Sequence, residues 1–384
     1  MSVNFSYHRI LPMNAKDSYK EFDVVDFQLD FPERSLVLGS IRLEGEVEVL
    51  VDNSITLNRA TATSTGQNAN VMDIKIDGDA GAHAFCESIT TTINGQVVES
   101  ITDYPRYCKM SATAMTSPHD NNNSENVCEL KAPRSAITNN ILGGEIVATD
   151  PALASGIPLR NNPDFSIKPR VCLNGGQGNL PSRRGSDIIL SFNLARNYGA
   201  LFGLDVSAVV SYNLKDLRLV YNSVPDDGSN EPIPVRSKIS IKQSLQSSNA
   251  NVNVRVPAIC DSVSMSFNVQ SQENSAKYNN LALHAVPNLT NTQFLFNDQT
   301  NSLVSYQIRN NAEIIDRAID SFVDAEKNSL SPARLANGNG FLMGLNMDEM
   351  IDLSRQKFSV ELQSSINNLV PLVMYFYFHS SLTL

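Results

Sequence analysis

The sequence predicts an all-β chain built from sandwich-like or barrel-like domains. Three observations lead to this prediction: most segments alternate apolar and polar residues with a period of two, the connectors are rich in turn residues, and little of the chain has a helical pattern. Such alternation is typical of a strand with one buried face, and many short strands joined by turns are typical of sandwiches and barrels. The 384 residues are enough for two domains, each with its own core.

Residues 41–51 (IRLEGEVEVLV) give the clearest strand pattern. Ile41, Leu43 and, after Gly45, the valines at positions 47 and 49 alternate with charged side chains. Residues 21–31 alternate in the same way, with a slip at positions 25 and 26. The same pattern predicts further strands at residues 72–76, 88–93, 187–194, 207–224, 239–245, 252–256, 262–269, 281–285, 302–308, 358–364 and 369–380.

Turn and helix signals lie between these strands. Asn94-Gly95 predicts a tight hairpin. Two helices are predicted, at residues 104–115 and 311–327, and the second has the apolar stripe of a helix packed on a sheet. Residues 225–234 (PDDGSNEPIP) have the composition of an exposed linker. We therefore predict an N-terminal segment (residues 1–20), a first domain (21–224), a linker (225–234) and a second domain (235–384).

Charge and cysteine content exclude several classes of protein. The net charge is −10 and no cluster of Lys and Arg is present, so direct binding of nucleic acid is not expected. The five cysteines are odd in number and form no C-x-x-C motif, which indicates free buried thiols and argues against zinc and a disulfide framework. The N-terminus lacks a signal-peptide pattern, and the longest apolar run, residues 369–378, is too short for a membrane span.

No catalytic motif is present in the sequence. It contains no Gly-Lys-Ser/Thr phosphate loop, no G-x-S-x-G elbow and no paired histidine motif. Residues 77–79 (DGD) and 226–228 (DDG) could offer carboxylates to calcium, but they lack the spacing of an EF-hand loop, and turn chemistry explains both. We predict no catalytic, cofactor or metal site.

Three scattered cations near the N-terminus are the only binding residues that the sequence suggests. Arg9, Lys16 and Lys20 could touch anionic lipid headgroups, and a solvated tail is the alternative.

Three stretches carry a family resemblance. Residues 35–51 lead to residues 83–107 and read SLVLGSIRLEGEVEVLV and HAFCESITTTINGQVVESITDYPRY. Residues 204–224 read LDVSAVVSYNLKDLRLVYNSV, and residues 340–384 run from GFLMGLNMDEMIDLS through FSVELQSS to the last strand. Together they resemble the double jelly-roll capsid proteins of tailless icosahedral viruses, the group that includes tectiviruses, corticoviruses, adenoviruses and polinton-like elements.

The resemblance implies both a fold and a function. The fold is two tandem eight-stranded antiparallel jelly-roll β-sandwiches with short helical insertions. The function is that of a major capsid protein whose homotrimers form pseudo-hexameric capsomers of a virion shell, assembled in the host cytoplasm. The implied partners are neighbouring capsomers, penton and minor capsid proteins and an internal lipid membrane, which the N-terminal segment would face. Residues 53–70, 117–126 and 174–185 are candidates for outer tower loops, with disordered surface loops as the alternative.

Other functions remain open at this point. A vertex or minor capsid protein would carry jelly rolls in another arrangement and would form a pentamer or have a low copy number. A receptor-binding or carbohydrate-binding β-sandwich fits the Asn- and Ser-rich loops, but the missing signal peptide argues against it. A carbohydrate-active enzyme needs two carboxylates across a cleft, and the absence of Trp argues against a sugar site.

Overall fold

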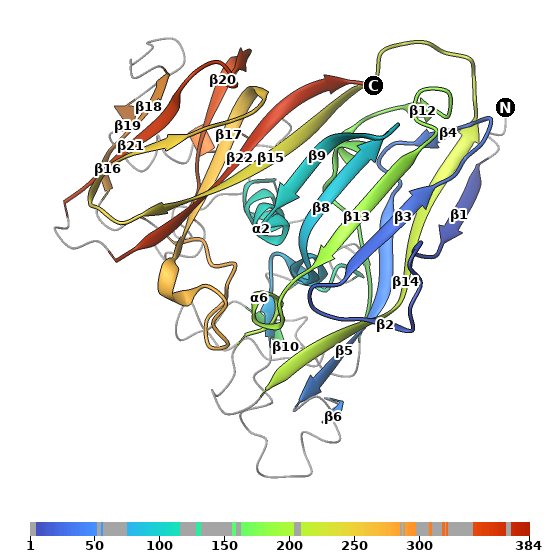
Figure 1. Ribbon diagram of the computed structural model, residues 1–384, viewed down its shortest axis with the longest axis horizontal. Helices are drawn as coiled ribbons and strands as arrows, with labels where there is room; N and C mark the ends of the chain where they lie inside the picture. Colours follow the sequence, from blue (N-terminus) through green and yellow to red (C-terminus); the bar gives the residue numbers. More distant parts are fainter. Residues whose placement is uncertain are drawn as a thin grey trace.

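The computed structural model describes most of the chain as two β-sandwiches side by side (Figure 1). The described residues are 5–51, 55–56, 75–115, 128–131, 156–158, 163–202, 209–284, 286, 289–296, 307–308, 317–318, 320–321, 341–365 and 370–384.

The first half contains an eight-stranded sheet in the order β11-β5-β14-β4-β12. β1 and β2 also pair with β14, and β6 pairs with β5. Its long central strand, β14, pairs antiparallel with β5 over most of its length. The bounds are β1 (Ser6–Ile10), β2 (Ser18–Tyr19), β4 (Arg34–Val37), β5 (Arg42–Val51), β6 (Ile55–Thr56), β11 (Asp164–Ile167), β12 (Asn179–Pro181) and β14 (Val210–Pro225).

A second eight-stranded sheet runs through both halves in the order β20-β17-β22-β15-β9-β8-β13-β3. Its two halves meet where β9 and β15 pair in parallel, with Ile239 opposite Ser100. The other neighbours are antiparallel. The bounds are β3 (Val24–Leu29), β8 (Cys86–Ile93), β9 (Gln96–Thr102), β13 (Ile188–Leu194), β15 (Pro234–Leu245), β17 (Ile259–Val269), β20 (Met343–Asp352) and β22 (Leu372–Thr383).

The second sandwich is completed by a four-stranded sheet in the order β16-β21-β18-β19. These strands are β16 (Asn249–Val254), β18 (Leu289–Phe296), β19 (Gln307–Ile308) and β21 (Phe358–Ser364). Each half therefore has two facing sheets, and strands that alternate with a period of two bury one side, as predicted, whereas β22 is buried on both sides from Leu372 to Ser380. In β5, for example, Leu43 and Val47 are buried in the first core.

Each sandwich encloses its own apolar core. In the first, Phe27 and Phe192 contact edge to face, with ring centroids 5.9 Å apart. In the second, Phe358 and Phe378 do so at 5.5 Å. The first core also contains residues of the second half, such as Tyr377. The division of the chain into two domains therefore stays a prediction, because the two halves share buried surface.

Short helices and turns connect the strands. The predicted helix at residues 104–115 is confirmed as α2 (Tyr104–Met115). Asn94-Gly95 forms the predicted hairpin turn, and both residues have positive φ. The smaller elements are β7 (Lys75–Asp77), η2 (Gly81–Phe85), β10 (Gly156–Pro158), α5 (Cys172–Gly175), α6 (Asn197–Ala200) and η5 (Gln270–Gln272).

One predicted strand is wrong. Residues 281–284 are described and form no strand. The side chain of Asn279 accepts the N–H of Leu281, and its backbone carbonyl accepts that of Ala282, so the chain turns there. Leu281 and Leu283 pack into the first core without belonging to a strand, so their apolar pattern does not indicate a sheet here.

Several predictions fall largely on residues outside the described part of the chain. They are the helix at residues 311–327, most of the strand at 302–308, and the tower loops at 53–70 and 117–126. Residues 174–185, the third predicted loop, contain the end of α5 and all of β12.

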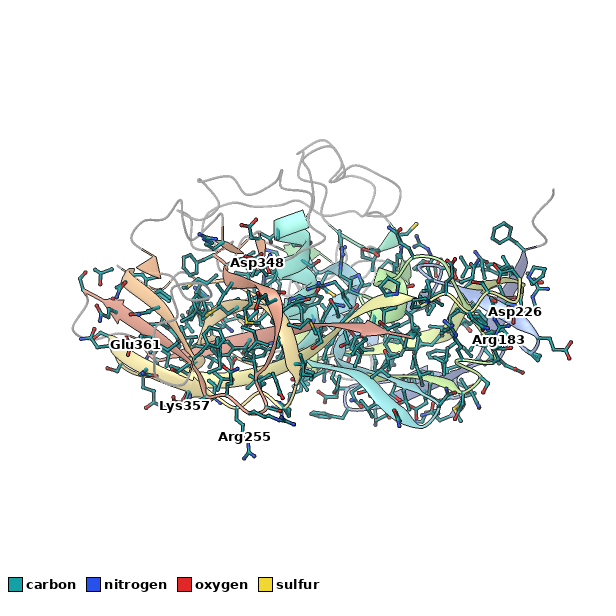
Figure 2. All side chains as sticks on the ribbon, turned by 90° about the horizontal axis from the view of Figure 1, so that it is seen from above. Arg183, Asp226, Arg255, Asp348, Lys357 and Glu361 are labelled. Atoms are coloured by element: carbon teal, nitrogen blue, oxygen red, sulfur yellow. The ribbon has the colours of Figure 1, made fainter. Side chains whose placement is uncertain are left out.

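The predicted linker connects the last residue of β14 to the first residue of β15. Arg183 pairs with Asp226 at 2.6 Å and holds the start of the linker at one end of the molecule (Figure 2). Arg255, Lys357 and Glu361 lie toward the opposite end in the same view. Among the described residues, no helix is both long and apolar enough to span a bilayer.

Candidate functional site

The three cations suggested by the sequence lie on the segment that contains β1 and β2. Arg9 forms an ion pair with Glu44 at 3.0 Å, and Lys16 Nζ forms one with Asp23 at 2.8 Å. The backbone N–H of Lys20 donates to the other carboxylate oxygen of Asp23 at 2.9 Å. Lys16 and Lys20 therefore meet at one carboxylate, whereas Arg9 has a different partner. Their contact with a lipid headgroup stays a prediction.

The most elaborate polar arrangement lies between the two sandwiches and is built around α2. The helix lies against the shared sheet near the junction of β9 and β15 (Figure 1), where its Tyr107 contacts Tyr377 of β22. Residues 104–114 are all buried, although Arg106 and Lys109 are among them. Pro105 in the first turn is well placed, because the N–H that it lacks has no partner within a helix. Buried charges need partners, and here those partners come from both halves.

Arg106 links the helix to the second half. Its guanidinium donates to the backbone carbonyl of Ala282 at 2.8 Å and to that of Asn280. The same group lies over the ring of Tyr375, 4.1 Å from the centroid. Burial lowers the pKa of Arg106, and the neighbouring Tyr377 opposes that shift. This one side chain fixes the course of the turn around residue 280 against α2.

Asp77 gathers three segments at a single buried carboxylate. Lys109 Nζ lies 2.5 Å from Oδ2, and the amide of Asn279 donates to the same oxygen at 2.6 Å. The other oxygen accepts the N–H groups of Asp79 and Ala80, as in an Asx turn. The residues 77–79 that could have suggested calcium therefore use the Asp77 carboxylate to join the two halves. No group of His, Cys, Asp and Glu among the described residues could hold a metal ion.

A second buried ion pair crosses the junction of β9 and β15. Lys238 Nζ lies 3.3 Å from Glu99, whose other oxygen accepts the N–H of Cys172 at 2.7 Å. Burial raises the pKa of Glu99, and Lys238 opposes that shift. Beside this pair, Thr102 hydrogen-bonds to Ser240 through both its N–H and its hydroxyl, at 2.6 and 2.8 Å. Side chains thus reinforce the short parallel pairing of the shared sheet.

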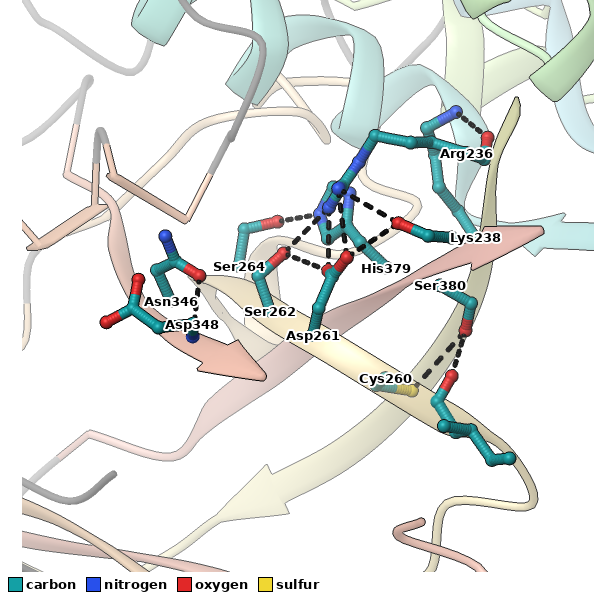
Figure 3. A network of polar contacts seen from close by, with 12 residues as sticks. Arg236, Lys238, Cys260, Asp261, Ser262, Ser264, Asn346, Asp348, His379 and Ser380 are labelled. Atoms are coloured by element: carbon teal, nitrogen blue, oxygen red, sulfur yellow. Dashed lines mark hydrogen bonds and ion pairs between the residues drawn. The ribbon is translucent and has the colours of Figure 1, made fainter. Parts of the chain in front are cut away.

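Strands β15, β17 and β22 carry a third network close to the same junction (Figure 3). The guanidinium of Arg236 binds Asp261 through both terminal nitrogens, at 2.9 and 2.7 Å. His379 Nε2 lies 3.1 Å from the hydroxyl of Ser264. Burial lowers the pKa of His379 well below its usual value, and the positive charges of Lys238 and Arg236 act in the same direction. His379 is therefore neutral at neutral pH.

A buried group of reactive residue types includes Tyr104 and Cys108 of α2. His83 Nδ1 is 2.8 Å from the hydroxyl of Tyr104, and Nε2 is 3.4 Å from Glu129. Burial alone would raise the pKa of Cys108, but the adjacent His83 lowers it. His83 and Cys108 are both fully buried, so a substrate could not reach them. Sequence reasoning missed this group because His83, Tyr104 and Glu129 are more than 20 positions apart from one another, and only Tyr104 and Cys108 are close along the chain.

The outer face of the first sheet has a shallow groove of about 440 Å³ between β5, β11 and β14. Arg9 and Arg218 line it together with four carboxylates, from Glu44, Glu46, Asp164 and Asp216. Phe165 is the only aromatic residue among the described lining, and it is buried. The groove therefore lacks the exposed aromatic platform that a sugar-binding site commonly uses.

Two tandem β-sandwiches that share a sheet fit the double jelly-roll fold. No family model and no curated protein matches the sequence. Solved structures match over the whole chain. The Faustovirus major capsid protein is 7% identical with a TM-score of 0.62, and the match covers 100% of this chain and 90% of that one.

Two further solved structures have the same arrangement. PBCV-1 VP54, which was fitted into a reconstruction of the virophage Sputnik, is 10% identical with a TM-score of 0.59, covering 100% of this chain and 95% of that one. The mavirus major capsid protein is 8% identical with a TM-score of 0.51, covering 98% and 86%. At these identities the likeness establishes the fold, as the sequence predicted.

Proposed function

We propose that this chain is the structural major capsid protein of an icosahedral virus and that its homotrimers form pseudo-hexameric capsomers. The observation that carries the proposal is the rigid union of two similar sandwiches through a shared sheet and buried ion pairs. Three such chains around a threefold axis place six similar sandwiches in a ring. A ring of this kind has a nearly hexagonal outline, and hexagonal units can cover the surface of a shell. The likeness to the Faustovirus and mavirus major capsid proteins supports this proposal.

The work of such a protein is assembly, and we propose no catalytic turnover. Its partners would be other copies of itself in the same and neighbouring capsomers, together with penton and minor capsid proteins. Its location would be the virion shell, after assembly in the host cytoplasm. An internal membrane, with Arg9, Lys16 and Lys20 facing its headgroups, stays a prediction from the family resemblance.

The mass of the purified chain in solution tests the proposal. Light scattering on a sizing column should give a particle of three times 42.1 kDa, and electron micrographs should show a hexagonal outline. A particle of five times that mass would indicate a vertex protein instead. A chain that stays monomeric at all concentrations would contradict both capsid functions and favour a binding module.

A further inference from the structure

The buried contact among Asp77, Lys109 and Asn279 places an amine and a carboxamide beside one carboxylate oxygen. Lys109 Nζ lies 2.5 Å from Asp77 Oδ2, and Asn279 Nδ2 lies 2.6 Å from the same oxygen. The two nitrogens are therefore no farther apart than the sum of these distances. The lysine comes from α2 and the asparagine from the turn at residues 279–282 in the second half, so the two groups lie on opposite sides of the junction between the sandwiches.

All three side chains are excluded from solvent. The exposed fraction is 0% for the Lys109 side chain, 1% for that of Asp77 and 1% for Asn279. Their chain neighbours Ile76 and Met110 belong to the first apolar core. In such surroundings an ammonium and a carboxylate in contact can pass the proton between them and become a neutral amine and a carboxylic acid. A neutral buried amine is a nucleophile, and the absence of water keeps hydrolysis from competing with its attack.

Backbone groups hold the carboxamide of Asn279 and polarise it. Its Oδ1 accepts the N–H of Leu281 at 3.0 Å, and its backbone carbonyl accepts the N–H of Ala282 at 3.1 Å. The Arg106 guanidinium of α2 also binds the carbonyl of Ala282, at 2.8 Å, and so fixes this turn against the helix. A donor on the carboxamide oxygen stabilises the negative charge that develops there when a nucleophile attacks the adjacent carbon.

The Asp77 carboxylate is oriented to carry a proton between the two nitrogens. Its Oδ1 accepts the N–H groups of Asp79 and Ala80 at 2.9 and 2.8 Å, and its Oδ2 contacts the amine and the carboxamide. Both nitrogens lie within hydrogen-bond reach of Oδ2, as general acid–base catalysis requires. This one oxygen can therefore take a proton from the attacking amine and give it to the departing nitrogen.

We propose that Lys109 and Asn279 form an intramolecular isopeptide bond, with Asp77 as the proton carrier. The Lys109 ammonium gives one proton to Asp77 Oδ2, and the neutral Nζ attacks Cγ of Asn279, so that an N–C bond forms and negative charge moves to Oδ1. Asp77 then donates its proton to Nδ2, the Cγ–Nδ2 bond breaks with its electron pair on nitrogen, and ammonia leaves. Nζ returns a proton to Asp77 as the new amide forms. The step consumes no oxidant, reductant or other reactant.

The other buried lysine at the junction has no carboxamide beside its carboxylate. Lys238 pairs with Glu99 at 3.3 Å, and the other oxygen of Glu99 accepts the backbone N–H of Cys172. Lys238 should therefore keep a free amine, whereas Lys109 should not. The bond would form once in each chain and join the two sandwiches covalently. It goes beyond the proposed capsid function and adds no catalytic turnover.

The intact mass of the purified and denatured chain tests the proposal. The wild type should be lighter than its sequence by one molecule of ammonia. Lys109→Arg keeps a cation beside Asp77 but supplies no nucleophile, and Asp77→Asn removes the proton carrier, so each should have its full sequence mass. Lys238→Arg is the matched control at the other buried pair, and it should still lose one ammonia.

A tryptic digest of the wild type locates the bond whether or not the variants fold. Trypsin cannot cleave after an acylated lysine, so residues 107–131 should form one peptide that is branched to residues 278–309. A wild-type chain of full sequence mass, with both peptides unmodified, would overturn the proposal. An ammonia loss that maps to an Asn-Gly pair such as Asn94-Gly95 would be a succinimide and would overturn it too. A branched peptide in Asp77→Asn would overturn the role of Asp77. None of these results bears on the oligomer mass that tests the proposed function.

Discussion

Replacing Arg106 with Met should weaken the union of the two sandwiches. The substitution removes two charge-assisted hydrogen bonds, to the carbonyls of Ala282 and Asn280, and the contact with the Tyr375 ring. Each lost hydrogen bond of this kind costs about 1.5–3 kcal/mol, partly because a buried acceptor stays unsatisfied, and the cation–π contact adds about 1–2 kcal/mol. Apolar contacts of the Met side chain offset part of this loss. We expect the free energy of unfolding to fall by about 3–5 kcal/mol.

Urea denaturation followed by circular dichroism and tyrosine fluorescence measures this loss. Arg106→Lys keeps a positive charge near the ring but cannot reach both carbonyls, so it should lose about half as much. Arg255→Met, at an exposed position, should change the free energy of unfolding by less than about 0.5 kcal/mol. If Arg106→Met cost less than about 1 kcal/mol, the guanidinium would not be holding the turn against α2 and the reasoning would be refuted.

Three further predictions follow from single features. Because the pKa of His379 is lowered in the folded chain, its contribution to stability is complete above the unfolded pKa of about 6.5 and is lost as pH falls below it, by at most about 1.4 kcal/mol per pH unit. His379→Gln should flatten the fall in unfolding free energy between pH 6.5 and 5, and an unchanged slope would contradict this. Gly344→Ala places a Cβ 2.2 Å from Ser321 Oγ and should destabilise by about 1–3 kcal/mol in thermal melts, whereas Gly175→Ala meets nothing within 4 Å and should be neutral. A thiol reagent should label Cys128 rapidly in the native protein and the four buried cysteines only after denaturation; rapid labelling of a second thiol would refute the burial assigned to them.

Strands such as β5 and β21 could be predicted because apolar and polar residues alternate along them. Residues 41–51 alternate cleanly and form β5, and residues 358–364 form β21 within the predicted bounds. Short edge strands escaped prediction, since β1 and β11 offer only four or five residues of pattern. β20 was also missed, because its buried first half has no alternation.

The buried polar contacts between the two sandwiches could not be predicted, because the residues that form them are far apart along the chain. Asp77 and Asn279 are 202 positions apart, and Glu99 and Lys238 are 139 apart. Nothing local marks a lysine or an aspartate as buried when its partner is supplied by another sheet. The strand predicted at residues 281–285 was wrong for a related reason. The apolar side chains of residues 281–284 fill a core that other segments form, while the backbone turns and pairs with no strand.

The sheet that passes through both sandwiches has a mechanical consequence. A mechanical force on either sandwich is transmitted through the backbone hydrogen bonds of the shared sheet. The weakest part of this sheet is the seam between β9 and β15, where the strands pair at a single residue pair. Bending should therefore concentrate at that seam. The Glu99–Lys238 ion pair and the Thr102–Ser240 hydrogen bonds cross the seam and oppose this bending. In a shell built from such chains, each chain would bend at the β9–β15 seam before either of its sandwiches deforms.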